Sequence, residues 1–357
     1  MGKRTPLYDT HARAGAKLVD FAGWDMPIHY GSQIEEHFHV RRDAGMFDVS
    51  HMLAIDLTGT EVAFLLAHLL ANDVAKLKQA GKALYSCMLN PAGGVIDDLI
   101  VYYFNPEHYR LVVNAGTAEK DLRWITGQAQ PYAVELNPRH DLAIIAVQGP
   151  QARQRLWQAY PATREASAAL PPFFAAFDGD WLIARTGYTG EDGFELALPA
   201  DQASDVWAQL AACGVAACGL GCRDTLRLEA GMNLYGQDMD ETVTPLESGL
   251  AWTVALEGER DFIGKKALLS QRPARQLLGL VLLERGVLRA HQRVDTAQGA
   301  GEITSGSYSP LLEQGIALAR LPAATVVGDI VGVDIRGKLH DARVVKPPFV
   351  RNGKAMI

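Results

Sequence analysis

The sequence of 357 residues lacks several features that would place it in a specialised class of protein. Its most apolar stretches, 64–71 and 277–283, are far shorter than the roughly 18–20 residues that a membrane helix needs. The basic residues at its start are not followed by an apolar segment, so the pattern does not predict a secretory signal. Four cysteines are too few for a disulfide framework and predict free thiols in a reducing cytoplasm.

Other absences exclude classes of function. The chain has 34 basic and 41 acidic residues, a formal net charge of −7, and so no general attraction to nucleic acid or to an anionic membrane. It contains no Gly-x-Gly-x-x-Gly or P-loop pattern, which argues against a dinucleotide or nucleotide site. No Gly-x-Ser-x-Gly elbow supports an acyl-transfer serine. Its histidines and cysteines lack the spacing of metal ligands, so we expect no metal.

The first half of the chain alternates strand and helix patterns. Ser32 and Glu35 have capping-box spacing and predict a helix that stops near Gly45. The order β-α-β-β-(β)-α-β that follows is typical of a ferredoxin-like split unit with one extra strand. In that order we expect strands at 52–57, 83–89, 95–104, 109–113 and 133–136, and helices at 60–70 and 117–126.

The second half ends in a region rich in strands. Before it, we expect a strand at 142–147, a helix with Pro150 in its first turn, a hairpin of 181–186 and 194–198, and helices at 203–212 and 220–230. Beyond residue 274 helical patterning fades, and a small β-barrel or sandwich is predicted. Its expected strands are 277–283, 301–305, 316–319, 330–335 and 339–345.

Two adjacent aspartates stand on an otherwise apolar strand, in Gly94-Val-Ile-Asp-Asp-Leu. Alternation places Asp97 and Asp98 on opposite faces, each among apolar neighbours. A buried carboxylate is costly unless it is paired, hydrogen-bonded or protonated, so this pattern suggests a function. The alternative is that either aspartate lies at the wet end of the hairpin and binds loop amides.

Two further segments carry candidate polar residues. Glu195 follows the glycine-rich stretch Arg185-Thr-Gly-Tyr-Thr-Gly-Glu-Asp-Gly-Phe, on the less apolar face of its strand, where it could also be merely solvated. Arg223 and Arg227 are four residues apart on one helix face. They could form a salt-bridged amphipathic helix or an anion clamp, because the guanidinium fork suits carboxylates.

Taken together, these segments resemble the aminomethyltransferases of the glycine cleavage system, the T-protein family. The resemblance runs nearly from end to end of the chain, and several long motifs in order are more specific than any one of them. The motifs are Thr5-Pro-Leu-Tyr, Val19-Asp-Phe-Ala-Gly-Trp-Asp-Met-Pro, Gly45-Met-Phe-Asp-Val-Ser-His-Met, Gly94-Val-Ile-Asp-Asp-Leu, Arg185-Thr-Gly-Tyr-Thr-Gly-Glu-Asp-Gly-Phe-Glu, Gly221-Cys-Arg-Asp-Thr-Leu-Arg-Leu-Glu-Ala-Gly, Tyr235-Gly-Gln-Asp-Met-Asp-Glu and Ile303-Thr-Ser-Gly.

The resemblance implies a reaction and a fold. The family moves the methylene of S-aminomethyldihydrolipoyl, held on H-protein, to tetrahydrofolate; ammonia is released and 5,10-methylenetetrahydrofolate formed. The implied fold is α+β, a three-part cloverleaf with a ferredoxin-like split unit and a C-terminal small β-barrel. We expect a folate-binding region over 1–274, made of two interleaved subdomains (about 1–50 plus 138–274, and about 51–137), and a barrel domain over 275–357.

The resemblance also implies roles for particular residues. It makes Asp98 the catalytic carboxylate. It implies lipoylated H-protein as partner, with the P- and L-proteins in the same system, and a cytoplasmic location without nucleic acid or membrane. Cys222 stands where the family usually has alanine, which could add sensitivity to oxidation. The folate-binding residues that it implies are Tyr85, Tyr102, Asn114, Tyr188, Glu195, Arg223 and Arg351.

Two alternative functions share this fold. One is a folate-dependent demethylase that acts on sulfonium or N-methyl substrates, sometimes as a domain fused to a flavin dehydrogenase. The other is a non-catalytic folate-binding regulator, whose relatives carry a Lys-Gly-Cys-x-x-Gly-Gln segment. Here the corresponding stretch, Met232-Asn-Leu-Tyr-Gly-Gln, has no cysteine, and the retained Asp98 favours an enzyme.

Overall fold

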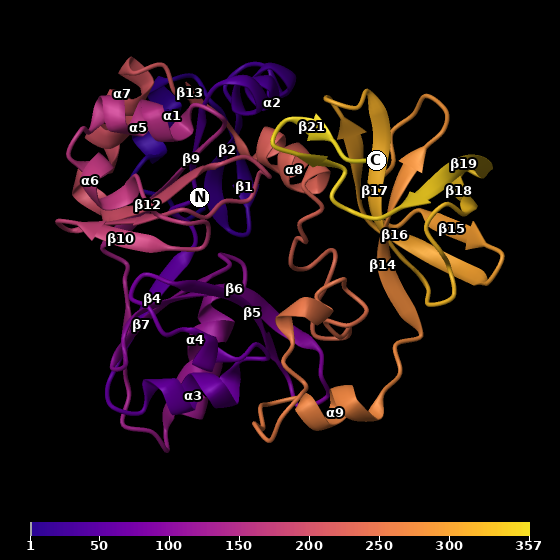
Figure 1. Cartoon of the computed structure of the whole chain (residues 1–357). Helices are drawn as coiled ribbons and strands as arrows, with labels where there is room; N and C mark the ends of the chain where they lie inside the picture. Colours follow the sequence, from indigo (N-terminus) through magenta and orange to yellow (C-terminus); the bar gives the residue numbers. More distant parts are fainter. Residues whose placement is uncertain (1) are drawn as a thin grey trace. The chain divides into compact units, whose positions relative to one another are not determined.

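Three large β-sheets organise residues 2–357, the part of the chain that the computed structural model describes (Figure 1). Contacts divide the chain into two units. The six-stranded sheet belongs to unit 1 and the closed barrel to unit 2, while the five-stranded sheet has residues in both. The division into three parts at residues 50, 138 and 274 stays a prediction. Unit 1 consists of Met1–Leu69, Val74–Ser86 and Leu99–Arg223, and unit 2 of Leu70–Asp73, Cys87–Asp98 and Asp224–Ile357.

The six-stranded sheet of unit 1 is built around one fully buried strand, β9 (Leu142–Gln148). β9 pairs antiparallel with β12 (Gly193–Pro199) on one side and with β3 (Gly45–Asp48) on the other. Because both faces of β9 are covered, its sequence is apolar from Leu142 to Val147, as is typical of buried strands, and only its last residue, Gln148, is polar. The outer strands are β10 (Ala175–Asp178), β11 (Trp181–Ala184) and β13 (Ala216–Ala217).

Helices cover one face of this sheet (Figure 1). α7 (Ala203–Ala212) buries Val206, Trp207 and Leu210, whose helical spacing forms one apolar stripe against β9 and β12. α5 (Ala152–Ala159) packs beside it, and α6 (Thr163–Ser167) follows. The predicted bounds of α7 are confirmed, but Pro150 lies two residues before the first residue of α5 rather than in its first turn.

The first 45 residues hold more structure than the sequence indicated. The predicted cap of α2 (Gln33–Arg42) is confirmed, since Ser32 Oγ accepts a hydrogen bond from the Glu35 amide. The helix ends at Arg42 with Asp43 as its cap, before the predicted stop at Gly45. Elements that the sequence analysis did not predict are α1 (Tyr8–Arg13) and the hairpin of β1 (Lys17–Phe21) and β2 (Trp24–His29).

The five-stranded sheet has the succession of elements expected of a split βαβ unit. Its strand order is β5-β6-β7-β4-β8, which is a ferredoxin-like arrangement with β5 as the added edge strand. The predicted bounds of β5 are confirmed. The elements are β4 (Leu53–Thr58), α3 (Val62–Leu69), the 3₁₀ turn Val74–Lys76, β5 (Ala83–Leu89), β6 (Val95–Asn105), β7 (His108–Val113), α4 (Ala118–Ala129) and β8 (Glu135–Pro138).

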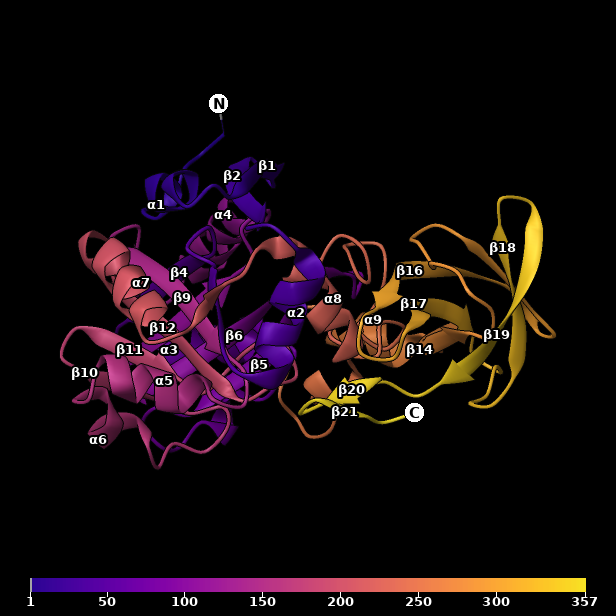
Figure 2. The same cartoon turned by 90° about the horizontal axis from the view of Figure 1, so that it is seen from above.

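Unit 2 contains the predicted barrel, closed in the order β14-β17-β16-β15-β18-β19 (Figure 2). On β14, Leu280 and Leu282 face the barrel interior, whereas Val281 packs outside it with Phe349 and Leu228. Both faces of this strand are therefore buried. The strands are β14 (Arg275–Leu282), β15 (Arg293–Thr296, not predicted), β16 (Gly299–Ser309), β17 (Gln314–Pro322), β18 (Ile330–Ile335) and β19 (Lys338–Val345).

The remaining elements of unit 2 are short, apart from one helix that crosses the boundary between the units. α8 (Leu220–Glu229) contains Arg223 in unit 1 and Arg227 in unit 2. The others are the 3₁₀ turn Ala251–Thr253, α9 (Lys265–Ser270) and the small hairpin of β20 (Val350–Arg351) and β21 (Lys354–Ala355); the 3₁₀ turn Ala200–Gln202 belongs to unit 1.

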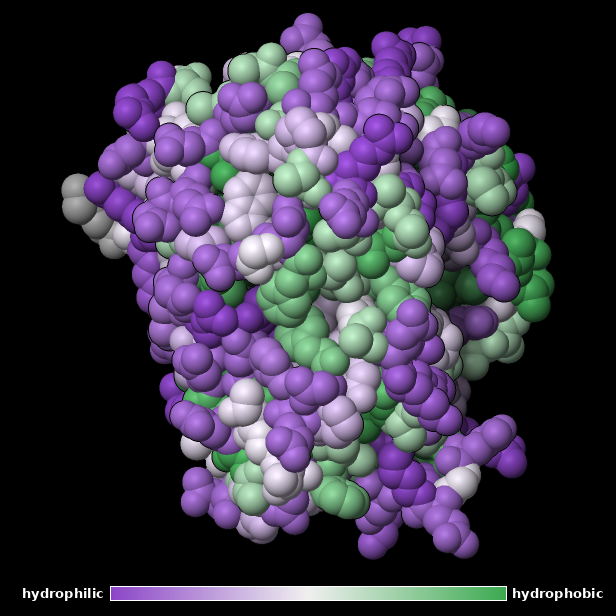
Figure 3. Space-filling model, turned by 60° about the vertical axis from the view of Figure 1, so that its left-hand side comes forward, coloured by the Kyte–Doolittle hydropathy of each residue, from purple (hydrophilic) through white to green (hydrophobic). Residues whose placement is uncertain are grey.

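The surface is mainly hydrophilic on the face that Figure 3 shows, with apolar side chains gathered in smaller groups. The exposed large apolar residues include Phe64, Trp252 and Leu269. Among residues 2–357, no helix is both long enough and apolar enough to cross a membrane.

A buried ion cluster fixes the centre of the five-stranded sheet. Asp56 on β4 accepts hydrogen bonds from Arg110 Nε at 2.6 Å and Nη2 at 2.8 Å, and from Arg139 Nη1 at 2.8 Å. Burial alone would raise the pKa of Asp56, but Arg110 and Arg139 outweigh it and hold that pKa below its usual value. Arg110 is itself buried, and Asp56 is the carboxylate that pairs with its guanidinium.

We predict that Asp56→Ala destabilises the protein by about 3–5 kcal/mol, because it leaves the guanidinium of Arg110 buried and uncompensated. Urea denaturation followed by circular dichroism would measure the loss as a lower midpoint. The matched control is Asp295→Ala, which removes the partner of the exposed Arg293 and should leave the midpoint nearly unchanged. Equal midpoints for Asp56→Ala and the parent would contradict the prediction.

Candidate functional site

The two aspartates of β6 differ in their surroundings. Asp97 is fully buried, whereas Asp98 is only partly buried. The same alternation continues along the strand: Leu99 is buried and Ile100 is partly exposed. Thus Asp97 and Leu99 lie on a face of β6 that packs in the core, whereas Asp98 and Ile100 lie on a face that is partly accessible to solvent. The alternative of a wet position at the end of the hairpin does not apply to Asp97, which is fully buried, and Asp98 is neither sealed in the core nor fully exposed.

A buried thiol lies close to these carboxylates. Cys87, on β5, is fully buried, and its Sγ is 3.6 Å from Thr253 Oγ1. Burial raises the pKa of Cys87, and the negative charges of Asp98 and Asp97 raise it further. The sulfur therefore stays protonated at neutral pH and is not a nucleophile.

Three residues of unit 1 form a hydrogen-bond chain that ends on Glu195. The Thr186 hydroxyl donates to Glu195 Oε2 at 2.5 Å, and the Tyr102 hydroxyl lies 3.1 Å from Thr186 Oγ1. Since Thr186 has only one proton to give, Tyr102 acts as the donor to it. Burial and the charge of Glu195 raise the pKa of Tyr102, so the phenol keeps its proton. Sequence analysis missed Thr186, although it lies in the motif that carries Glu195.

The second oxygen of Glu195 is free to bind a ligand. Glu195 stands on the face of β12 opposite Phe194 and Leu196, which belong to the apolar core. No group within residues 2–357 donates a hydrogen bond to Oε1, and the side chain is only partly buried. A carboxylate held this way can accept a bond from an N–H group of a bound molecule.

The glycine-rich loop before β12 is fixed by buried Gln148. Its Nε2 donates to the Thr186 carbonyl at 3.1 Å, and its Oε1 accepts from Thr189 Oγ1 at 3.0 Å. Gly187 packs so closely on this amide that a Cβ would lie 1.9 Å from Gln148 Oε1. Glycine is therefore required there by close approach, as the sequence had suggested for the loop.

Arg223 lies among aromatic rings and keeps an unused donor. Its Cζ is 4.9 Å from the ring centre of Tyr188 and 5.7 Å from that of Phe47. Nη1 is buried and has no hydrogen-bond partner within residues 2–357. Burial lowers the pKa of Arg223, opposed by the negative charge of Glu195. A buried donor without a partner is costly, so this group is suited to an acceptor atom of a ligand.

The salt-bridge interpretation of the arginine pair holds for Arg227, while the anion-binding interpretation stays a prediction for Arg223. Arg227 is the salt-bridged one: its Nε donates to Asp224 at 2.8 Å and its Nη1 to Asp238 at 2.9 Å. Arg223 is the one that remains suited to an anion or a polar acceptor. Sequence spacing could not separate them, because Asp238 lies outside the helix.

His51 is a buried polar residue near Arg223 and Asp48 to which the sequence analysis assigned no role. Its side chain is buried, and its Nδ1 has no hydrogen-bond partner in the described part of the chain. Burial lowers the pKa of His51 to about 4; the charge of Asp48 opposes this shift and that of Arg223 adds to it. A neutral imidazole therefore lies in the same electrostatic environment as Arg223.

Asp48, in contrast, has several hydrogen-bond partners within the protein. It accepts hydrogen bonds from Thr5 Oγ1 at 2.6 Å and from the Ser50 amide at 2.9 Å, and its Oδ2 is 2.9 Å from His11 Nε2. Burial would raise the pKa of Asp48, but these bonds and the charge of His11 lower it. Asp48 is thus ionised and structurally engaged.

The other predicted residues are placed as follows. Tyr85 on β5 and Asn114 after β7 are partly buried, and the Asn114 carbonyl accepts from Thr117 Oγ1 at 3.1 Å. Arg351 on β20 is exposed. The structure thus brings Tyr102 together with Glu195, and Tyr188 with Arg223, while Asp98 and Arg351 belong to unit 2. The folate-binding role of each stays a prediction.

The cysteines and histidines form no metal-like cluster: residues 2–357 contain no group of three or more His, Cys, Asp or Glu side chains placed to hold an ion. All four cysteines are free thiols. Cys222 is fully buried and burial raises its pKa well above the usual value, which argues against the expected sensitivity to oxidation.

Comparison with known proteins gives consistent matches along the chain. The model of the GCVT N-terminal domain matches residues 7–258, and that of the glycine cleavage T-protein C-terminal barrel domain matches residues 275–351. The chain is 61% identical to an aminomethyltransferase of Nitrosomonas europaea over 100% of both chains. It is 58% identical to one of Burkholderia orbicola, over 99% of this chain and 98% of the relative.

A solved structure also matches. It is that of the glycine cleavage system aminomethyltransferase T from Bartonella henselae, with a TM-score of 0.93 and 36% sequence identity. The match covers 99% of each chain. The predicted fold class, α+β with a C-terminal barrel, is confirmed.

The buried His51 leads to a prediction about stability and pH. Its pKa is about 4 in the folded protein and near 6.5 in the unfolded chain. Between these values the unfolded chain binds the extra proton, so stability falls as pH is lowered from about 6.5 to 4. Asp48 acts only at lower pH, because its folded pKa is below its usual value.

We predict that in His51→Gln the thermal midpoint falls less steeply between pH 6.5 and 4. The slope should decrease by about the contribution of the one proton that His51 takes up on unfolding. Differential scanning calorimetry of the ligand-free protein at several pH values measures this slope. His291→Gln, at an exposed histidine, is the control and should keep the parent's slope. An unchanged slope in His51→Gln would show that another group takes up the proton.

Proposed function

The chain belongs to the T-protein family of the glycine cleavage system, the aminomethyltransferases, and from this premise we propose which of its residues perform the reaction. The enzyme moves the methylene of the aminomethyl group on lipoylated H-protein to tetrahydrofolate. Ammonia leaves, and 5,10-methylenetetrahydrofolate and reduced lipoyl H-protein are formed. Tetrahydrofolate is thus a substrate and H-protein the partner.

We propose that Asp98 is the catalytic carboxylate. The observation that carries this proposal is the contrast on β6: Asp97 is sealed in the core, while Asp98 stands on the accessible face of the same strand. Transfer of the methylene requires positive charge to develop as ammonia departs. A fixed carboxylate beside apolar side chains stabilises such charge strongly and can orient the attacking folate amine.

Glu195, Tyr102 and Thr186 are proposed to bind the heterocycle of folate. A pterin ring presents N–H groups along one edge, and Glu195 Oε1 can accept from them while Oε2 is held by Thr186. Tyr102 stays protonated and fixes Thr186. Thr186 therefore holds Oε2 of the Glu195 carboxylate in place before the ligand arrives, which lowers the ordering cost of binding.

Arg223 supplies the complementary donor. Its unpartnered Nη1 suits a carbonyl or carboxylate oxygen of folate, and the ring of Tyr188 against its guanidinium holds it in place. Tyr85, Asn114 and Arg351 complete the proposed folate contacts, on the family resemblance alone.

The finer partners are proposals as well. We infer that the P- and L-proteins act in the same system on the same lipoyl carrier. A folate-dependent demethylase and a non-catalytic folate binder are the alternatives. An assay with aminomethyl-loaded H-protein separates them, since only an aminomethyltransferase releases ammonia from it, whereas a demethylase transfers a methyl group from a small sulfonium compound.

We predict that Asp98→Asn lowers turnover by about 10²-fold or more while tetrahydrofolate binding changes little, because the charge acts on the transition state rather than on the bound substrate. Ammonia release from aminomethyl-loaded H-protein gives kcat, and fluorescence titration gives folate affinity. Asp341→Asn, an exposed aspartate on β19, serves as control. Turnover of Asp98→Asn within a few-fold of the parent would refute the assignment.

We predict that Glu195→Gln raises the KM for tetrahydrofolate about 10-fold or more, with a smaller effect on kcat, because an uncharged amide with one acceptor oxygen cannot accept from both Thr186 and an N–H group of folate. Steady-state kinetics at saturating H-protein measures both constants. Glu302→Gln, an exposed barrel residue, should leave them unchanged. A fall in kcat without any rise in KM would instead place Glu195 in the chemical step.

A further inference from the structure

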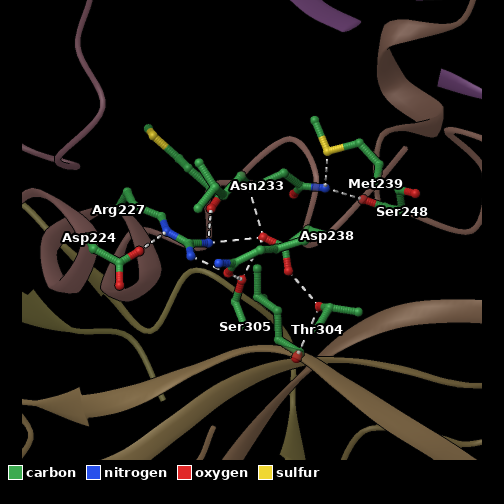
Figure 4. Close-up of polar contacts among 12 residues, drawn as sticks. Asp224, Arg227, Asn233, Asp238, Met239, Ser248, Thr304 and Ser305 are labelled. Carbon is green, nitrogen blue, oxygen red and sulfur yellow. Dashed lines mark hydrogen bonds and ion pairs between the residues drawn. The ribbon is translucent and has the colours of Figure 1, made fainter. Parts of the chain in front are cut away.

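A buried ion pair in unit 2 lies outside the proposed substrate contacts (Figure 4). Asp238 and Arg227 are almost fully buried and are joined at 2.9 Å. Two hydroxyl groups of β16 donate to the same carboxylate, Thr304 to Oδ1 and Ser305 to Oδ2. The carboxylate is thus fully satisfied, and it ties the segment before it to a strand of the barrel.

The segment 233–240 is folded tightly around this carboxylate. The Leu234 amide donates to Asp238 Oδ2 at 2.8 Å, and the Gly236 amide donates to the Met239 carbonyl at 2.8 Å. Arg320 Nη2, from β17, donates to the Asp238 carbonyl at 2.7 Å. We call residues 233–243 the clamp loop, because of the contacts that follow.

The clamp loop holds the beginning of β6. The Tyr235 hydroxyl donates to the Val95 carbonyl at 3.2 Å. On the other side, the Val95 amide donates to the carbonyls of Asp240 at 3.0 Å and Val243 at 3.1 Å. Both polar groups of the Val95 backbone are therefore bound by the clamp loop.

The hairpin turn just before β6 is held by the same loop. Asn90 Nδ2 donates to the Glu241 carbonyl at 3.0 Å. Gly94 lies so close that a Cβ there would be 1.8 Å from that carbonyl oxygen. The backbone at 90–95 cannot shift toward the clamp loop, and its hydrogen bonds prevent it from moving away.

We propose that Tyr235 is a positioning residue for the reaction, which fixes β6 through Val95 so that the Asp98 carboxylate keeps its place. Val95 is three residues from Asp98, about 10 Å along an extended strand. Displacements of about 1 Å at a reacting group can cost about 100-fold in rate. This inference rests on the proposed catalytic role of Asp98.

The test is Tyr235→Phe, which removes one hydroxyl group and keeps the ring. We expect kcat for ammonia release to fall about 10-fold, with the KM values for tetrahydrofolate and H-protein within two-fold of the parent. A purely structural role would lower the thermal midpoint without this split. Tyr308→Phe, at an exposed tyrosine of β16, is the matched control and should leave kcat unchanged.

A double-mutant cycle with Asp98→Asn makes the outcome decisive. If Tyr235 acts through Asp98, adding Tyr235→Phe to Asp98→Asn lowers kcat no further. Equal kcat for Tyr235→Phe and the parent, or the same further loss in both backgrounds, would overturn the positioning role. Full turnover of Asp98→Asn alone would overturn the proposed function instead, so the two failures are distinguishable.

Thr304→Val gives a second measurement farther from the strand. It removes the hydroxyl bond to Asp238 and leaves Arg227 and Ser305 in place. Since the clamp loop then has one anchor fewer on the barrel, kcat should fall a few-fold with KM unchanged. If kcat is unchanged in both Thr304→Val and Tyr235→Phe, the proposal that contacts from the barrel through the clamp loop position β6 is contradicted.

Discussion

Burial of charge is the constraint on which this structure depends, because a carboxylate taken out of water must find donors inside the protein. Asp56 finds Arg110 and Arg139, and Asp238 finds Arg227 with two hydroxyl groups. Within residues 2–357, Arg223 Nη1 and Glu195 Oε1 stand outside such pairings. The same physical cost that closes the structural pairs is the reason for proposing the buried Arg223 Nη1 as a ligand contact.

Sequence patterns predicted the elements that have strong periodicity. The bounds of β5, β18 and α7 were confirmed. In α7 the helical spacing of Val206, Trp207 and Leu210 matches burial on one face, and in β18 the buried Val331 and Val333 alternate with less buried residues. The hairpin of β1 and β2 was missed because neither strand shows apolar alternation: β1 is largely exposed, and the two buried residues of β2, Met26 and Pro27, are adjacent. Pro150 was predicted to lie in the first turn of a helix, but it lies in the turn that precedes α5. Proline is compatible with both positions, so the sequence did not distinguish them.

The candidate site could be predicted only in part. The resemblance supplied Asp98, Glu195 and Arg223, but reasoning from the residues alone left open a solvated strand position for Glu195 and a simple salt bridge for the arginine. What separates the alternatives is contact over long sequence distance: Asp238 and Ser305 engage Arg227, and thereby leave Arg223 as the unpaired arginine. Spacing along a single helix contains no information about such partners.

The free thiols of this chain have a practical consequence for spectroscopy. Cys87, Cys218 and Cys222 are buried, whereas Cys213, at the C-terminal cap of α7, is partly exposed. A maleimide dye under mild conditions will therefore attach to one position without mutagenesis. That position lies on unit 1, so a single dye labels this unit and leaves unit 2 unlabelled.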